Sequence, residues 1–290
     1  KNTTSFFWLS KETSILINNW FMMYFLSVIL IGTIYPIFLE VLSSEKISVG
    51  PPFYNKLIIP FLIPFLFAMT IGPKLNWIKS GLKNKFNLII FLIISFLLSY
   101  LIIKDLKISF LINTVLIGSA FFLFFVTMRD FMKSKFRNLS QSLGHLGFSL
   151  LILSILFNNI FSSEIITNLK IGETFESKKV SISFESVEKK EHQNFNAVIG
   201  KFKILHSDGK IEFLEPELRI YNQPNIVTSE ADIKTNLLKD IFMTINLVQN
   251  QEYFNVRYQI KPFMLWIWLS VLLISFGGLI SFLKKRQNEI

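Results

Sequence analysis

SLGHLGFSLLILSILFNN, residues 142–159, is an apolar run in which His145 is the one ionisable side chain. A bilayer core about 30 Å thick is crossed by roughly 20 helical residues, so this run predicts most of a membrane span. Five more runs in the chain are similarly long and apolar. The six predicted spans run approximately from Ile15 to Phe38, Leu57 to Ile78, Phe86 to Ile103, Ile108 to Met128, Ser142 to Phe161 and Pro262 to Leu283.

The composition supports a membrane protein. Hydrophobic residues make up 51% of the 290 residues, and Phe alone occurs 32 times, which is unusual for a soluble domain. The chain contains no cysteine, so structural disulfides, thiolate metal sites and catalysis by a thiol of its own are excluded. It begins with Lys1 and shows no cleavable signal peptide. We therefore expect a fragment, a processed product or one piece of a split protein.

The net charge of +10 is unevenly distributed. Residues 162–261 contain 13 basic and 14 acidic residues, whereas the other 190 residues contain 17 and 6. The basic excess thus belongs to the membrane part, which argues against nucleic acid as a partner. Alternate loops between the spans carry Lys79, Lys83 and Lys85, then Arg129, Lys133, Lys135 and Arg137, and finally Lys284, Lys285 and Arg286. The positive-inside rule places these loops and both termini in the cytoplasm, on one side of the inner (cytoplasmic) membrane.

Residues 162–261 change from continuous apolar runs to alternation with a period of two. In VSISFESV, KFKIL and KIEFL, this alternation puts one pair of apolar residues on one face of each strand. The pairs are Ile182 and Phe184, Phe202 and Ile204, and Ile211 and Phe213. Turn-forming SDGK and NQPN separate such segments. About a hundred residues of short strands predict a small antiparallel sandwich or barrel.

These patterns predict a polytopic α-helical membrane protein with six transmembrane helices and a small, mainly-β domain inserted before the last helix. Residues 1–161 would form the first five helices and residues 162–261 the periplasmic domain. Residues 262–290 would form the last helix and a basic cytoplasmic tail.

His145 admits two interpretations. It is either a polar residue bonded to a neighbouring helix or reaching toward the interface, or a functional group such as a proton relay or a metal ligand. A stripe of small residues, Ser140, Gly144, Gly147 and Ser154, lies along its helix. Small residues allow close helix packing, and they also leave room for a flat macrocycle. Gln141, Ser142 and Ser149 lie about one turn away and could orient the imidazole.

Other candidate residues have simpler interpretations. His192 and His206 lie among charged residues of the β domain and are predicted to be surface residues. SEKISVGPPFYN, residues 44–55, predicts a stiff outward loop, and Trp266 and Trp268 suit interfacial anchors. With one membrane histidine and no cysteine, the chain alone cannot build a zinc or bis-histidine site. A second ligand would have to come from elsewhere. No phosphate loop, carboxylate pair or Ser/His/Asp set is recognisable.

Several stretches together resemble the CcmF family, the haem lyase subunit of a cytochrome c biogenesis system. They are LINNWFMMYFLSVILIGTIYPIFLEVLSSEKISVGPPFYNK, SLGHLG, TSEADIKTNLLKDIFMTINL and VRYQIKPFMLWIWLSVLLISFGGLI. EKISVGPPFYN and KPFMLWIW are quite specific, and the resemblance covers nearly the whole chain.

The resemblance implies a quinol-to-haem oxidoreductase joined to a haem–apocytochrome ligase. In the family, two histidines from different spans hold a haem b, and GHLG matches one of these motifs, so His145 is the implied axial ligand of the haem iron. The haem b would take electrons from quinol and keep ferrous the haem that CcmE delivers. This haem, the substrate, is then joined by thioether bonds to Cys-x-x-Cys-His of apocytochrome c with the help of CcmH.

The chain departs from the family pattern because it lacks the motifs that lie in the N-terminal half of family members. A Trp-rich haem-handling segment, two outward histidines and the second haem b histidine are missing. We therefore expect that the missing half, truncated or encoded as a separate subunit, is a partner, and that this chain alone is not a complete lyase. Lys135 and Arg137 are candidate partners of haem propionates, although as basic loop residues they also satisfy the positive-inside rule.

Two other functions stay open from the sequence. A non-catalytic membrane scaffold could dock CcmH, CcmE or the apocytochrome, with His145 merely packed. Transport of haem or of a solute has less support, because neither an inverted repeat nor a pair of broken helices is visible.

Overall fold

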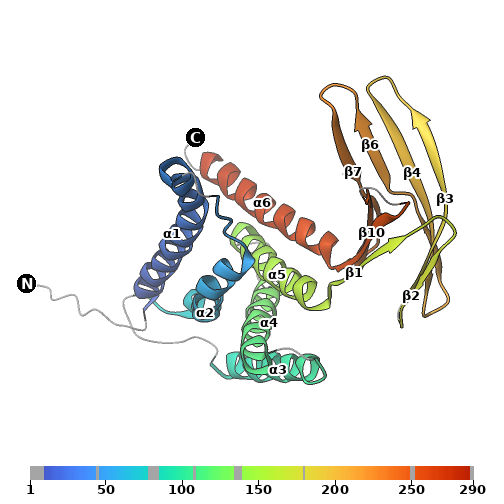
Figure 1. The fold of residues 1–290 in the computed structure, drawn as a ribbon. Helices are drawn as coiled ribbons and strands as arrows, with labels where there is room; N and C mark the ends of the chain where they lie inside the picture. The colour runs from blue at the N-terminus through green and yellow to red at the C-terminus, as the bar shows by residue number, and fades with distance from the viewer. Residues whose placement is uncertain are drawn as a thin grey trace, which may run out of the picture. The chain divides into compact units, whose positions relative to one another are not determined.

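The computed structural model describes residues 10–43, 46–77, 85–106, 109–133, 139–178, 180–248 and 252–287. These residues form six α-helices that are all long and apolar enough to cross a membrane, with a β domain before the last (Figure 1). The helices are α1 (Lys11–Ser43), α2 (Pro51–Ile71), α3 (Lys85–Ile103), α4 (Phe110–Lys133), α5 (Leu139–Phe161) and α6 (Met264–Gln287). A 3-10 helix, η1 (Gly72–Lys74), follows α2. The predicted fold class is thereby confirmed.

The first two helices begin earlier than the apolar runs alone predict. Ser10 caps α1, since its Oγ accepts a hydrogen bond from the backbone N–H of Thr13 at 3.3 Å. Helix α2 begins at Pro51, because proline is well suited to the first helical turn, where the missing N–H would have no partner. The prediction of a loop up to Asn55 is therefore wrong for residues 51–55, which are the first turns of α2.

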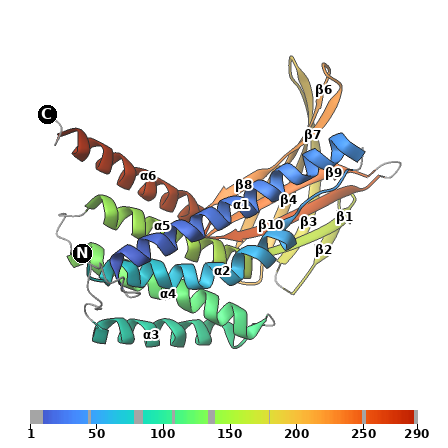
Figure 2. The same cartoon turned by 90° about the vertical axis from the view of Figure 1, so that its left-hand side faces the viewer.

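Helices α1 and α2 pack through aromatic rings and one glycine. The ring centroids of Tyr24 and Phe61 lie 4.2 Å apart, and the Tyr24 hydroxyl donates to the carbonyl of Leu57 at 3.0 Å. A Cβ atom at Gly32 would lie 2.7 Å from the hydroxyl oxygen of Tyr54. Only glycine therefore allows this ring to approach α1 so closely. Helices α3 and α4 lie side by side (Figure 2).

Helices α5 and α6 contact each other through the small-residue stripe. A Cβ atom at Gly147 would lie 3.0 Å from the backbone N of Ile274 and from the backbone O of Ser270. Ser140 Oγ donates to the carbonyl of Gly277 at 2.8 Å. The stripe thus accounts for close helix packing, and at Gly147 the backbone of α6 leaves no room for a macrocycle.

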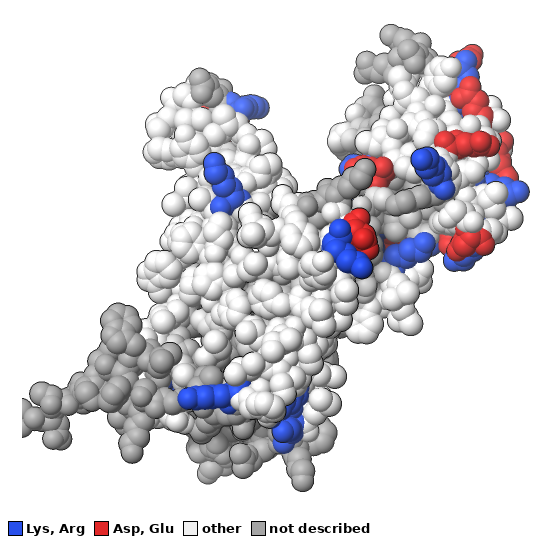
Figure 3. Space-filling model, turned by 90° about the horizontal axis from the view of Figure 1, so that it is seen from below, with Lys and Arg blue, Asp and Glu red and all other residues white. Residues whose placement is uncertain are grey.

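The β domain is an antiparallel sandwich, one of the two forms that the strand pattern predicted. One sheet has the strand order β1–β10–β9–β8, and the other has the order β2–β3–β4–β6–β7 with β5 also paired to β4. The strands are β1 (Ser163–Leu169), β2 (Thr174–Glu176), β3 (Val180–Glu191), β4 (Phe195–His206), β5 (Ile211–Leu214), β6 (Glu217–Tyr221), β7 (Ile226–Glu230), β8 (Asp232–Thr235), β9 (Lys239–Leu247) and β10 (Phe254–Pro262). On the face drawn in Figure 3, charged residues of both signs gather over the sandwich, whereas the surface over the helices is mostly uncharged.

The core of the sandwich joins both sheets. Ile182 and Phe184, and Phe202 and Ile204, share faces as predicted; these faces are buried, and the rings of Phe184 and Phe202 stack at 4.3 Å. They meet Ile241, Met243, Ile245, Val256 and Tyr258 of the opposite sheet.

Strand β5 is oriented opposite to what its apolar residues suggest. Ile211 and Phe213 do share one face, but they are 48% and 53% exposed, while Glu212 and Leu214 point inward. The register pairs Glu212 with the core residue Ile204. Alternation decides which residues share a face, whereas pairing with β4 decides which face is buried.

Candidate functional site

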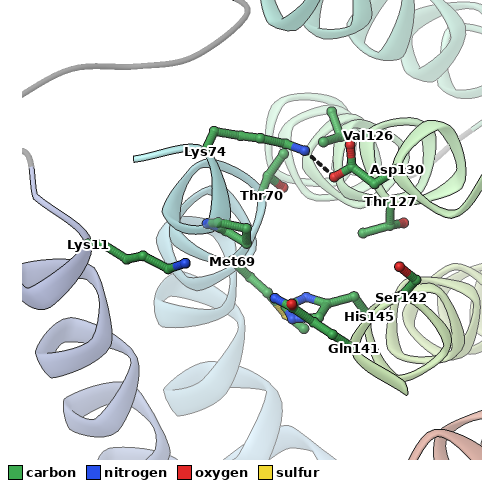
Figure 4. A pocket seen from close by; sticks show the side chains of 11 residues that line it. Lys11, Met69, Thr70, Lys74, Val126, Thr127, Asp130, Gln141, Ser142 and His145 are labelled. Atoms are coloured by element: carbon green, nitrogen blue, oxygen red, sulfur yellow. Dashed lines mark hydrogen bonds and ion pairs between the residues drawn. The ribbon is translucent and has the colours of Figure 1, made fainter. Parts of the chain in front are cut away.

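His145 lines a polar cavity between four helices (Figure 4). The cavity has a volume of about 260 Å³, and its lining comes from the start of α1, the end of α2 with η1, the end of α4 and the start of α5. The lining residues are Lys11, Met69, Thr70, Pro73, Lys74, Val126, Thr127, Asp130, Gln141, Ser142 and His145.

A second cavity of about 290 Å³ adjoins the first and shares His145 as a lining residue. The two cavities also share Lys11, Met69, Pro73 and Gln141. Residues that line only the second cavity are Ser14, Ile15, Asn18, Ala68 and Gly72. The imidazole thus lies where a polar space and a more apolar space meet.

The imidazole of His145 makes no hydrogen bond to any residue in the part of the chain that the structure describes. Gln141 and Ser142 line the same cavity, but neither is hydrogen-bonded to the ring. Ser149 is engaged elsewhere, because its hydroxyl lies 3.1 Å from Thr127 Oγ1 and donates to the carbonyl of Leu146. The prediction that Ser149 orients the imidazole therefore has no support in these contacts.

Three charged residues line the cavity, and Figure 4 shows Lys11 apart from the pair of Lys74 and Asp130. Lys74, whose side chain is 13% exposed, forms an ion pair with Asp130. The ammonium group of Lys11 lies 5.0 Å from the ring centroid of Trp77, and the backbone N–H of Lys11 donates to the carbonyl of Asn76. Two cations and one carboxylate leave the lining with one net positive charge when His145 is neutral.

Lys11 and Lys74 line the cavity although the sequence patterns did not predict it. Each lies at the end of a predicted span, and consecutive antiparallel spans bring the start of the first close to the end of the second. The positions of these two lysines at the ends of consecutive spans could therefore have indicated that they lie close together. Lys135 and Arg137, the predicted propionate partners, lie outside the described residues.

The lining fits one side of a haem site. Within the described residues, no group of three or more His, Cys, Asp or Glu side chains could hold a metal ion. An iron ion at His145 would therefore need further donors, such as the ring nitrogens of a macrocycle. Each cavity alone is smaller than the usual ligand pocket of about 300–1,000 Å³, but the two adjoining spaces together fall within that range. The net positive charge of the lining suits an anionic group such as a porphyrin carboxylate.

The two remaining histidines occupy the β sandwich. His192 is exposed and stacks on Phe195 at 4.6 Å, as expected for a surface residue. The same expectation is wrong for His206, whose side chain is only 10% exposed and whose Nε2 lies 3.4 Å from a carboxylate oxygen of Glu212. The inward orientation of β5 brings this carboxylate to His206, and alternation alone did not predict it.

Comparison with known proteins places the fold in a defined class. Residues 160–262 match the family described as the CcmF C-terminal beta-sandwich. A solved structure titled "Cytochrome c Heme Lyase CcmF" has a similar fold, with a TM-score of 0.73 and 21% identity over 94% of this chain and 46% of that one. The molecule is therefore a multi-pass membrane protein that carries a CcmF-type β sandwich before its last helix.

The chain is also similar in sequence to complete proteins that are named for cytochrome c biogenesis. The chain is 27% identical to cytochrome c-type biogenesis protein CcmF of Pseudomonas fluorescens and 26% identical to that of Escherichia coli (strain K12). These matches cover 99% and 97% of this chain but only 46% and 45% of the relatives. The chain is thus a CcmF homologue that spans about half the length of these relatives and corresponds to their C-terminal part.

Proposed function

We propose that the chain is the C-terminal part of a cytochrome c haem lyase in which His145 is one axial ligand of a haem b within the membrane. The observation that carries this proposal is the imidazole of His145, which has no hydrogen-bond partner among the described residues and faces two adjoining cavities that Lys11 also lines. Similarity to proteins named CcmF supports the choice of haem over other ligands.

The residues of the cavity have separable roles in this proposal. His145 donates a lone pair to the iron, and Gln141 and Ser142 orient its ring. Lys11 attracts a haem carboxylate, because Asp130 already pairs with Lys74. Thr70 and Thr127 are satisfied within the bundle, since their hydroxyls donate to the carbonyls of Leu66 and Leu123.

The remaining parts of the activity lie beyond this chain. A haem at this site supplies one-electron transfer from quinol toward the haem that is to be attached. A polypeptide that corresponds to the N-terminal half of the relatives would supply a further ligand to the iron. CcmE-bound haem, CcmH and an apocytochrome c with a Cys-x-x-Cys-His motif are the proposed partners. The chain is then an enzyme only together with that half.

The proposed orientation follows from the basic end of the helix bundle. Lys11, Lys74, Arg129 and Lys133 lie at the start of α1, the end of η1 and the end of α4. The backbone bond between Lys11 and Asn76 and the ion pair between Lys74 and Asp130 bring these ends together. The positive-inside rule then puts this end in the cytoplasm and the sandwich in the periplasm of a cell whose inner membrane holds the protein.

A second candidate function is a scaffold that docks a haem-delivery or apocytochrome partner. The observation in its favour is an exposed apolar strip on the sandwich. Leu205 pairs with Ile211 across β4 and β5, and these two residues and Phe213 are 44%, 48% and 53% exposed. In this case His145 would not serve as an iron ligand.

A spectrum of the assembled protein separates the two functions. The chain is produced together with the N-terminal half, and the visible spectrum is recorded before and after addition of dithionite. We expect a haem b signal that is lost or strongly shifted in His145→Ala and unchanged in His192→Ala, a matched variant at an exposed histidine. An unchanged haem content and potential in His145→Ala would leave only the scaffold.

A further inference from the structure

The turn between β8 and β9 exposes two consecutive leucines. Leu237 and Leu238 are 69% and 66% exposed, more than any other large apolar side chain that the structure describes in the β domain. The turn itself is well ordered by hydrogen bonds, since the side-chain oxygen of Asn236 accepts from the backbone N–H groups of Leu238 and Lys239 at 3.0 and 2.9 Å. The two leucines are thus presented by a defined backbone rather than left at a frayed end.

This turn is attached to the first turn of α6. The indole Nε1 of Trp266 donates to the carbonyl of Leu237 at 2.8 Å, and the backbone N–H of Phe263 donates to the carbonyl of Leu238 at 2.8 Å. Phe263 adopts a φ of 59°, a left-handed conformation that is unfavourable for a bulky residue. The change from strand β10 to helix α6 therefore takes place directly against the leucine turn.

The end of α5 reaches the same place. Asn158 Nδ2 donates to the carbonyl of Pro262 at 2.6 Å, and the rings of Phe157 and Phe263 lie 5.3 Å apart. The leucine turn thus lies at the level where two membrane helices, α5 and α6, meet the sandwich. Tryptophan near a helix end is typical of the membrane interface, and Trp266 belongs to this level.

We infer that Leu237 and Leu238 insert into the outer part of the lipid bilayer and anchor the sandwich to the membrane surface. The occupant is lipid because the backbone of the turn is bonded to the first residues of a membrane helix, so acyl chains are the nearest apolar medium. Lys239, the next residue, suits the level of the lipid phosphates. This inference depends on the membrane position of α6 and not on haem binding.

The absence of cysteine from the chain makes a direct test practical. Single variants Leu237→Cys, Leu238→Cys and Leu247→Cys are each labelled with a nitroxide and placed in lipid nanodiscs as full chains. Leu247 is the matched control, because it is 54% exposed and ends the same strand, β9, about 27 Å from its start. Collision of each label with oxygen, which concentrates in acyl chains, is compared with collision with a water-soluble nickel complex.

We expect the ratio of oxygen to nickel collisions to be several-fold higher at positions 237 and 238 than at position 247. Equal ratios at all three positions would put the turn in water and overturn the inference. Low collision rates with both reagents at 237 and 238 would mean that a second copy or another polypeptide covers the leucines, which also overturns it. Two independent labelled positions allow the test to proceed if one variant does not fold.

Discussion

At the scale of single residues, the site depends on one imidazole. His145 has Gly144 and Gly147 on either side of it along α5, yet the backbone of α6 packs on Gly147 while His145 faces α1, α2 and α4. The same short motif therefore does two things on different faces of one helix. Gly147 lets the helices meet, and His145 lines the cavity.

Removal of the imidazole should leave a space that a free imidazole can fill. We expect His145→Gly, produced with the N-terminal half, to lose haem b signal and to regain it when imidazole is added, because the added ring takes the place of the missing ligand. The reduced-minus-oxidised spectrum measures the recovery. If imidazole has no effect on a variant that inserts normally, His145 does not coordinate the iron directly.

At the scale of helices, glycine positions decide how closely α5 and α6 pack. We expect Gly147→Ala to destabilise the helix bundle by about 1–3 kcal/mol, because the added Cβ atom would lie 3.0 Å from backbone atoms of Ile274 and Ser270, which cannot move aside easily. Thermal unfolding in detergent measures this change.

Gly144→Ala is the matched control for that substitution. It makes the same change one turn earlier in α5, where a Cβ atom meets nothing within 4 Å. Alanine also favours helix over glycine by roughly 1 kcal/mol, so this variant should be as stable as the parent or slightly more stable. A similar loss of stability in both variants would contradict the proposed α5–α6 packing.

At the scale of strands, the inward orientation of β5 gives the sandwich a pH dependence. Burial raises the pKa of Glu212, but the hydrogen bond from Lys210 and the neighbouring imidazole of His206 outweigh it, so the pKa lies below its ordinary value of 4.5. A carboxyl group with a lowered pKa binds its proton more weakly in the folded protein than in the unfolded one. Its contribution to stability is therefore present above pH 4.5 and is lost as the pH falls through the lower, folded-state pKa.

The variant Glu212→Gln isolates this contribution. We expect it to lower the unfolding temperature of the full chain near pH 7 and to reduce the further loss of stability on acidification below pH 4.5. Glu185→Gln, at an exposed carboxylate on β3, serves as the control and should keep the parental pH profile. An acid transition that is identical in Glu212→Gln and the parent would mean that Glu212 does not carry the effect.

At the scale of the whole molecule, the charge distribution predicts the orientation in the membrane. We expect Asn222→Cys, in the turn between β6 and β7, to react with a membrane-impermeant maleimide added outside cells from which the outer membrane has been removed. Lys133→Cys, at the end of α4, should react only after the inner membrane is opened, because basic helix ends are retained in the cytoplasm. Labelling in the opposite order would reverse the proposed topology.

The amino-acid sequence by itself determined the six apolar helices, the β domain before the last one and the position of His145. These features depend on local patterns, since span length, the period of two and the charge of loops are all readable along the chain. The resemblance to the CcmF family was also carried by linear motifs, and the comparisons confirm it.

Only the tertiary structure decided which residues share a site. Lys11, Lys74 and Asp130 come from three helices, and their meeting at the cavity of His145 depends on how those helices pack. The strand register likewise decided that Glu212 points inward beside His206, and that backbone bonds tie Leu237 and Leu238 to the start of α6. Alternation and hydropathy indicate which residues of one segment face water, lipid or the protein interior. Contacts between segments depend instead on the partners that folding brings together from distant parts of the chain.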